Sequence, residues 1–314
     1  MPDFPIRIGF CAPSRAVIDI STPALAKLYF QDRNAEVLLH DTVFKNVKQF
    51  AGTEDERLEG LMSMACNPDI DLVMPIRGGY GLTRILDRID FEAIAAVDPV
   101  LCGYSDFTAF NLAYFAKTGK VSYQGPNGTD FVDTPLYFTE KSFHSALFAE
   151  EWTCSFACRE APPTDMQGTL WGGNLSMIVS LLGSSYFPAV EGGILFLEDC
   201  NDRAYRLERS LMQLDMAGVL ARQKAILLGD FRDSDPAHPK DNDFLFADVL
   251  EWMKKRLPHV TILTGLPFGH SPVKATLPVG ANVRMRTEKG FVVLSTFDHP
   301  RVTPRFDAHA HHVA

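Results

Sequence analysis

The chain has 314 residues and a formal net charge of −9, from 30 lysines and arginines against 39 aspartates and glutamates. Hydrophobic residues make up 46% and charged residues 22% of the chain, which excludes a disordered protein and allows a sizeable buried core. The acidic balance disfavours a nucleic-acid binder, because such proteins need clustered lysine and arginine. The length predicts roughly two domains.

No targeting segment or metal set stands out in the sequence. Charges are scattered through the first thirty residues, and the longest apolar stretches, such as Leu175–Leu182, are far shorter than the ~20 residues that cross a bilayer. The six cysteines form no zinc-type set, and His309, His311 and His312 suit an incidental tail better than a metal site. We therefore expect a cytoplasmic protein with reduced cysteines, no metal and no membrane contact.

Residues 1–130 alternate short apolar runs with amphipathic stretches, as parallel βα units do. Strands are expected at Arg7–Ala12, Glu36–His40, Leu72–Ile76, Val100–Gly103 and Val121–Gln124. Helices are expected between and after them at Pro23–Arg33, Glu54–Met64, Phe91–Ala96 and Phe107–Thr118. Several of the strands are apolar throughout, so helices should cover both faces of the sheet. This pattern predicts a doubly wound α/β domain.

The remaining residues divide into a connecting region and a second domain. Residues 131–167 are rich in turn-forming residues, with one helix near Glu140–Phe148, and are predicted to connect the two domains. In residues 168–314 helices are expected at Asn174–Leu182, Tyr205–Ala217 and Phe244–Arg256, and strands at Ile194–Glu198 and Ala225–Gly229. The end of this domain is expected to be β-rich, with strands at Ala275–Pro278, Asn282–Thr287 and Gly290–Ser295.

The residues that follow each strand are the first candidates for a site, because ligands of open α/β sheets bind beyond the carboxyl ends of the strands. Ser105 stands where a strand turns directly into a helix, as a nucleophilic serine does, although Phe107 replaces the second glycine of the G-x-S-x-G pattern. The amides of Asp106 and of Gly79, in a glycine-rich turn, are candidate oxyanion donors. The same residues would also suit a helix cap and a tight turn.

Glu198 and His270 are the candidate acid and base. Glu198 ends an apolar strand, where a carboxylate could orient an imidazole or merely face a helix N-terminus. His270 follows a glycine-bounded loop that could hold a base, although a single loop histidine is usually solvated. The chain order Ser105, Glu198, His270 matches the nucleophile, acid and base order of α/β hydrolases. It would place the active site between the two domains.

A series of short blocks occurs in a characteristic order along the chain. The blocks include Arg77-Gly78-Gly79-Tyr80-Gly81, Gly103-Tyr104-Ser105-Asp106, Gly172-Gly173-Asn174-Leu175, Leu197-Glu198-Asp199, Gly269-His270 and Leu277-Pro278-Val279-Gly280. In these blocks and their order, the sequence resembles the LD-carboxypeptidase family of serine peptidases, from about residue 7 to about residue 295.

The resemblance implies a flavodoxin-like N-terminal domain, a smaller β/α C-terminal domain and a cytoplasmic homodimer that needs no metal or cofactor. Family members cut the amide bond between an L-configured residue and a terminal D-alanine in muropeptide tetrapeptides during cell-wall recycling. The resemblance maps the nucleophile to Ser105, the acid to Glu198 and the base to His270. It maps the oxyanion amides to Gly79 and Asp106.

Two other functions remain open at this point. A sister branch, the microcin-immunity serine peptidases, cleaves peptidyl or aminoacyl nucleotides. Trp171 and Tyr80 are available to stack on such a base, although both suit a packing role better. An alternative of another class is a two-domain protein that closes on a small ligand without chemistry.

The cation for a peptide's terminal carboxylate is a further expectation. Arg77 and Arg203 are the candidates, because an arginine binds a carboxylate through two parallel hydrogen bonds. The sequence departs from the family pattern at Arg203-Ala204 and at Asn127, where methionine is usual. These departures lie near the expected pocket and bear on the substrate more than on the chemistry.

Overall fold

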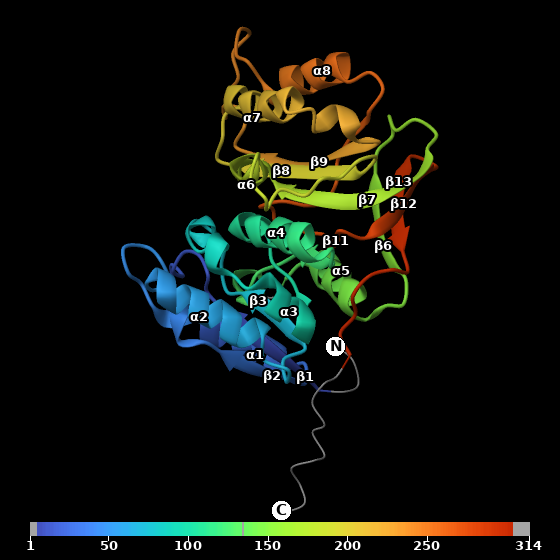
Figure 1. The fold of residues 1–314 in the computed structure, drawn as a ribbon. Coiled ribbons are helices and arrows are strands. Elements are labelled where there is room, and N and C mark those ends of the chain that lie inside the picture. Colours follow the sequence, from blue (N-terminus) through green and yellow to red (C-terminus); the bar gives the residue numbers. More distant parts are fainter. Residues whose placement is uncertain (1–4, 134, 304–314) are drawn as a thin grey trace, which may run out of the picture.

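The computed structural model describes residues 5–133 and 135–303. Its helices and strands fall into an N-terminal and a C-terminal half, stacked one above the other in Figure 1. His309, His311 and His312 lie outside the described residues, so the expectation for them stays a prediction.

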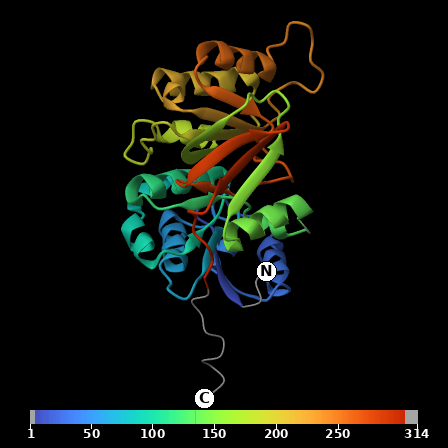
Figure 2. The same ribbon diagram turned by 90° about the vertical axis from the view of Figure 1, so that its right-hand side faces the viewer.

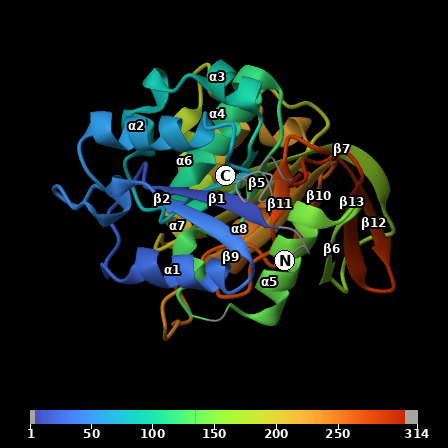
Figure 3. The same ribbon diagram turned by 90° about the horizontal axis from the view of Figure 1, so that it is seen from below.

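The N-terminal half is built on a four-stranded parallel sheet with the order β2-β1-β3-β4. Its strands are β1 (Ile6–Cys11), β2 (Ala35–Leu39), β3 (Leu72–Pro75) and β4 (Val100–Leu101). The helices of this half are α1 (Thr22–Gln31), α2 (Glu54–Ala65), α3 (Phe91–Val97), α4 (Thr108–Thr118) and α5 (Tyr137–Phe148). Figure 3 shows α1 and α5 on one side of the sheet and α2 and α3 on the other. The predicted doubly wound α/β layer is therefore confirmed.

The C-terminal half is built on a seven-stranded mixed sheet with the order β10-β9-β8-β7-β12-β13-β6. Its parallel part comprises β7 (Asp165–Asn174), β8 (Ile194–Cys200), β9 (Ala225–Arg232) and β10 (Thr261–Thr264). Its antiparallel part adds β12 (Asn282–Glu288), β13 (Phe291–Thr296) and β6 (Trp152–Ala157) to the edge of β7. Figure 2 shows this antiparallel part reaching down beside α5.

Helices cover the parallel part of this sheet. They are α6 (Leu175–Leu181), α7 (Ala204–Met216) and α8 (Phe246–Arg256). Figure 1 shows α7 and α8 on the face of the sheet that lies away from the N-terminal half. The described residues also contain six short 3₁₀ turns, at Asp41–Phe44 (η1), Leu82–Arg84 (η2), Leu86–Arg88 (η3), Ser105–Phe107 (η4), Gly128–Phe131 (η5) and Leu220–Arg222 (η6). None of the helices in the described part of the chain is long and apolar enough to cross a membrane.

A two-stranded antiparallel ladder joins the two halves. The predicted strand at Val121–Gln124 forms β5 (Ser122–Gln124). Its contact with the parallel sheet is a single isolated bridge between Tyr123 and Cys102, the residue that follows β4. Its ladder partner is β11 (Leu277–Val279), which belongs to the C-terminal part of the sequence. The two halves are therefore linked by backbone hydrogen bonds as well as by side-chain packing.

Strands β6, β7 and β10 were not among the strands predicted from the sequence. β7 contains three glycines, which count against a strand by propensity. The structure explains one of them, because a Cβ on Gly172 would overlap the carbonyl group of Phe196 on β8. Glycine at this position permits the close approach of two parallel strands that carry part of the site.

Candidate active site

Ser105 lies on a strained turn between strand β4 and helix α4. It begins the 3₁₀ turn η4, which leads directly into the helix, and its φ of 64° is in the left-handed region. Glycines make room for this turn. A Cβ on Gly103 would lie 2.6 Å from Cγ of Pro75, and a Cβ on Gly78 would lie 2.8 Å from Cβ of Ser105. A strained strand-to-helix turn of this kind presents a nucleophilic serine at the top of a sheet.

The structure brings Ser105, His270 and Glu198 together. His270 Nε2 lies 3.1 Å from Ser105 Oγ, and His270 Nδ1 lies 2.8 Å from Glu198 Oε2. The side chain of Glu198 is 0% exposed and that of His270 is 23% exposed. In this arrangement an imidazole can take the serine proton while a carboxylate fixes the orientation of the ring.

The carboxylate of Glu198 is engaged at both oxygens. Oε2 lies beside His270, and Oε1 accepts a hydrogen bond from Asn174 Nδ2 at 3.1 Å. Asn174 also caps α6, since its Oδ1 accepts the N–H of Met177 at 3.1 Å. The Asn174 side chain thus both caps the helix and contacts the candidate acid. A Cβ on Gly269 would lie 3.3 Å from Glu198 Oε2, so glycine allows the His270 loop to come this close.

The electrostatic surroundings of His270 include a thiol. Burial lowers the pKa of His270, but hydrogen bonds with Cys200 and with Glu198 outweigh it and raise the pKa to about 10. Cys200 ends β8 and lines the same cavity as Ser105 and His270. Asn201 Nδ2 lies 3.2 Å from its sulfur. Cys200 was not among the predicted site residues, and its position two residues after Glu198 is the feature of the sequence that could have identified it.

The glycine-rich turn after β3 lies against the turn that carries Ser105. A Cβ on Gly78 would lie 3.4 Å from the amide nitrogen of Asp106. The Asp106 side chain ties the two turns together, because its Oδ2 accepts the N–H of Leu82 at 2.9 Å. Burial raises the pKa of this carboxyl group. The amides of Gly79 and Asp106 therefore belong to two adjoining turns beside the Ser105 hydroxyl.

A buried arginine that sequence reasoning did not select supports the same turns. The Nη1 of Arg57 donates to the carbonyl oxygens of Pro13 and Gly81, at 2.5 Å and 2.8 Å. Arg57 lies on α2, and its residue is 1% exposed. A buried arginine in an amphipathic helix looks like an exposed one in sequence, so no local signal identified it.

A cavity of about 400 Å³ opens over Ser105 and His270. Two of the residues predicted to bind substrate, Arg77 and Tyr80, line it, and Arg15 lines it as well. Arg77 Nη1 donates to the carbonyl oxygen of a neighbouring loop residue, Ala16, at 2.6 Å. The Tyr80 residue is 51% exposed. Asn127, where the sequence departs from the family pattern, also lines the cavity.

Two other predicted residues are not part of this cavity. Arg203 is exposed at the N-cap of α7 and is absent from the lining of the cavity, because that helix begins beyond the strand that carries Glu198. Trp171 is fully buried, and its Nε1 donates to Gln223 Oε1 at 3.0 Å. It is a packing residue of the C-terminal half, as the preferred interpretation predicted, and is not available to stack on a nucleobase.

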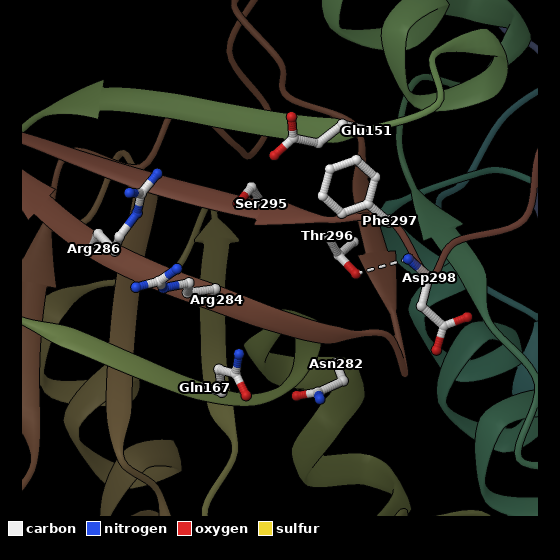
Figure 4. Close-up of a pocket in the computed structure, with 9 residues that line it drawn as sticks. All are labelled: Glu151, Gln167, Asn282, Arg284, Arg286, Ser295, Thr296, Phe297 and Asp298. Atoms are coloured by element: carbon white, nitrogen blue, oxygen red, sulfur yellow. Dashed lines mark hydrogen bonds between the residues drawn. The ribbon is translucent and has the colours of Figure 1, made fainter.

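A second hollow, of about 430 Å³, lies on the antiparallel strands (Figure 4). Glu151, Gln167, Asn282, Arg284, Arg286, Ser295, Thr296, Phe297 and Asp298 line it. The guanidinium of Arg284 is already engaged by Asp165, at 2.6 Å and 2.8 Å. The lining contains no histidine and none of the three candidate catalytic residues, so the chemistry described above belongs to the other cavity.

Two family models match most of the chain. Residues 8–125 match the LD-carboxypeptidase N-terminal domain, and residues 167–285 match the LD-carboxypeptidase C-terminal domain. The "Probable murein peptide carboxypeptidase" of Bacillus subtilis (strain 168) is 31% identical over 276 residues, which cover 86% of this chain and 85% of that relative. The "Murein tetrapeptide carboxypeptidase" of Pseudomonas aeruginosa is 31% identical over 293 residues, which cover 87% of this chain and 91% of that relative.

Solved structures share the fold. The muramoyltetrapeptide carboxypeptidase from Oxalobacter formigenes matches with a TM-score of 0.86 and 37% identity, over 94% of this chain and 99% of that chain. The microcin C7 self immunity protein MccF in complex with aspartyl sulfamoyl adenosine matches with a TM-score of 0.83 and 23% identity, over 94% and 97%. The second likeness shows the fold alone.

Proposed function

The chain belongs to the LD-carboxypeptidase family of serine peptidases, and from this premise we propose that it hydrolyses the amide bond to a terminal D-alanine in muropeptide tetrapeptides. The observation that carries the proposal is that His270 lies within hydrogen-bond distance of both Ser105 and Glu198, at an open cavity. The names of the Bacillus and Pseudomonas relatives fit this substrate. Such a reaction would serve cell-wall recycling.

In the proposed mechanism His270 removes the proton of the Ser105 hydroxyl as its oxygen attacks the scissile carbonyl carbon. Glu198 holds the imidazole and stabilises its cation. His270 then gives the proton to the departing amine of D-alanine, which leaves an acyl group on Ser105. Water, deprotonated by His270, releases the shortened peptide. The amides of Gly79 and Asp106 would bind the oxyanion, and each donor would lower the barrier by about 3 kcal/mol.

The terminal carboxylate requires a cation, and the cavity offers two. Arg77 and Arg15 both line the cavity, and burial and the neighbouring charge of Arg15 lower the pKa of Arg77. The described residues that line the cavity include no aspartate or glutamate. Two unbalanced positive charges beside the candidate nucleophile support a site for an anion, so we assign the carboxylate to Arg77 and Arg15.

We also propose that the enzyme works in the cytoplasm, as a homodimer, without a metal or cofactor. All six cysteines are described and none forms a disulfide, which suits a reducing compartment. The dimer rests on the family resemblance.

Hydrolysis of an aminoacyl or peptidyl nucleotide is a second candidate function. The exposed ring of Tyr80 supports it, since an aromatic side chain at the rim of the cavity could stack on a base. Tyr80 also contacts Phe50, with ring centroids 5.8 Å apart.

Mass spectrometry of the enzyme with two substrates tests these proposals. The enzyme is incubated with a tetrapeptide that ends in D-alanine and, separately, with an aminoacyl sulfamoyl adenosine. We expect release of D-alanine and a transient acyl adduct on Ser105. Ser105→Ala should abolish both, whereas Ser180→Ala, an exposed serine on α6, should change neither. Turnover of the nucleotide alone would favour the second candidate function.

The same preparation distinguishes an enzyme from a binding protein. A serine-directed fluorophosphonate should label Ser105 in the wild-type protein, because the neighbouring imidazole activates the hydroxyl. A protein that closes on a ligand without chemistry would bind the peptide but remain unlabelled.

A further inference from the structure

Lys274 is a buried lysine close to the candidate base, and the mechanism above gives it no role. Its side chain is 1% exposed. An ammonium group loses its hydration when it is buried, so it lowers stability unless the fold supplies partners for it. A methionine would occupy a similar volume without that loss. The partners of Lys274 therefore indicate what its charge does.

Two of the partners are the backbone groups on either side of His270. Lys274 Nζ donates to the carbonyl oxygen of Gly269 at 2.9 Å and to that of Ser271 at 3.1 Å. One ammonium group thus holds the chain immediately before and immediately after the imidazole. With both carbonyls fixed, the Cα of His270 has little freedom to move along the loop.

The other partners belong to the N-terminal half. Lys274 Nζ lies 4.1 Å from the centroid of the Tyr104 ring and 3.5 Å from Asp130 Oδ1. Tyr104 directly precedes Ser105, and its ring centroid lies 5.1 Å from that of His270. A cation over an aromatic face and beside a carboxylate is held from two directions. Lys274 therefore contacts both the loop of the base and the residue before the nucleophile.

We propose that Lys274 is a positioning residue that sets the distance between His270 and Ser105 across the two halves of the molecule. The inference rests on the proposed function, because it concerns the geometry of that same site. Lys274 acts through the loop backbone and through Tyr104, and its burial keeps it out of contact with substrate. Without the ammonium group, the 3.1 Å contact between imidazole and hydroxyl would no longer be enforced.

Thr139 offers a matched control. Its Oγ1 donates to the carbonyl oxygen of Pro272 at 2.8 Å and accepts the N–H of Lys274 at 2.9 Å. Thr139→Val therefore removes two hydrogen bonds from the same segment while the two carbonyls that flank His270 keep their partner. A general loosening of the segment would appear in both variants, and a loss of positioning would appear in only one.

The test measures the rate of fluorophosphonate labelling at Ser105, together with kcat and KM on the tetrapeptide. For Lys274→Met we expect labelling and kcat to fall about 100-fold, the effect of displacing a catalytic group by about 1 Å, with KM within about twofold of wild type. Thr139→Val should lower the melting temperature but keep labelling within about threefold of wild type.

A second variant covers the case in which Lys274→Met does not fold. Asp130→Asn retains an oxygen for the Asn127 N–H, which Asp130 Oδ2 accepts at 2.9 Å, and removes the charge beside Lys274. We expect about a fivefold loss of labelling, because the ammonium keeps its two carbonyl partners. A wild-type labelling rate in Lys274→Met would overturn the inference. If Lys274→Met does not fold, a wild-type labelling rate in Asp130→Asn would overturn it. So would an equal loss in Thr139→Val. An unlabelled wild-type protein would instead refute the proposed function.

Discussion

The two halves of the molecule hold their parts of the candidate site in different ways. The N-terminal half fixes Ser105 through the backbone, by a left-handed residue on a turn with room made by glycines. The C-terminal half fixes His270 through side chains, which are a buried carboxylate and a buried ammonium. The candidate nucleophile therefore depends on backbone geometry, and the candidate base depends on charged side chains, of which Glu198 comes from a distant part of the chain and Lys274 from the same loop.

The largest expected effect comes from removing the charge that holds the base. Glu198→Gln keeps the shape of the side chain but cannot stabilise the imidazolium, so kcat should fall about 10⁴-fold. Steady-state kinetics on the tetrapeptide measures the loss. The matched control is Asp199→Asn, a neighbouring buried carboxylate that accepts hydrogen bonds from Ser176 instead of His270. A comparable loss of kcat in this control would mean that the effect is one of folding and not of catalysis.

A smaller loss should follow from a change in the local geometry of the nucleophile. In Gly78→Ala the new methyl group would lie 2.8 Å from Ser105 Cβ, so the turn must shift. We expect kcat/KM to fall about 100-fold, as for other displacements of about 1 Å. Gly119→Ala provides the contrast, since its φ is 71° but no atom lies within 4 Å of the new methyl group. It should lower stability by about 1 kcal/mol and leave kcat/KM unchanged. Thermal unfolding of both variants measures the cost of backbone strain, and their kinetics measure the effect of displacing Ser105.

The smallest expected effect is a shift of the pH profile when the thiol of Cys200 is removed. Burial lowers the pKa of His270, but hydrogen bonds with Cys200 and with Glu198 outweigh it and raise the pKa to about 10. A general base works only in its neutral form. We therefore expect kcat/KM to rise with pH as the pH approaches 10. Cys200→Ala removes one of these hydrogen bonds and should move the rising limb of the profile to lower pH. Cys66, the C-cap residue of α2, does not line the cavity, so Cys66→Ala should leave the profile unchanged. An unmoved limb in Cys200→Ala would show that the thiol does not influence the imidazole.

The sequence was sufficient to predict the fold class and most of the elements. The N-terminal strands are short apolar runs separated by amphipathic helices, and local periodicity is enough to find them. Strand β7 was missed because its glycines serve the close approach to β8, a reason that lies in another strand. The ladder of β5 with β11 was missed for the same reason, since its partner lies far along the chain.

Some residues of the candidate site could likewise be predicted from the sequence, and others could not. Ser105 could be found from its place after a strand and before a helix, and the structure brings His270 and Glu198 to it within hydrogen-bond distance. Their catalytic roles stay predictions. Arg15 lines the cavity but was not selected from the sequence, whereas Arg203 was selected and is absent from the lining, because the loops that meet over the sheet decide which cations line the cavity. Neighbours in space that are distant in sequence leave no local pattern.

The ladder between β5 and β11 has a consequence for the protein while it is being made. β5 leaves the ribosome long before β11, and His270 emerges only shortly before β11. The turn that carries Ser105 can therefore fold before His270 has been translated. Pairings of distant segments form late, so hydrolysis would begin only when synthesis of the chain is nearly finished.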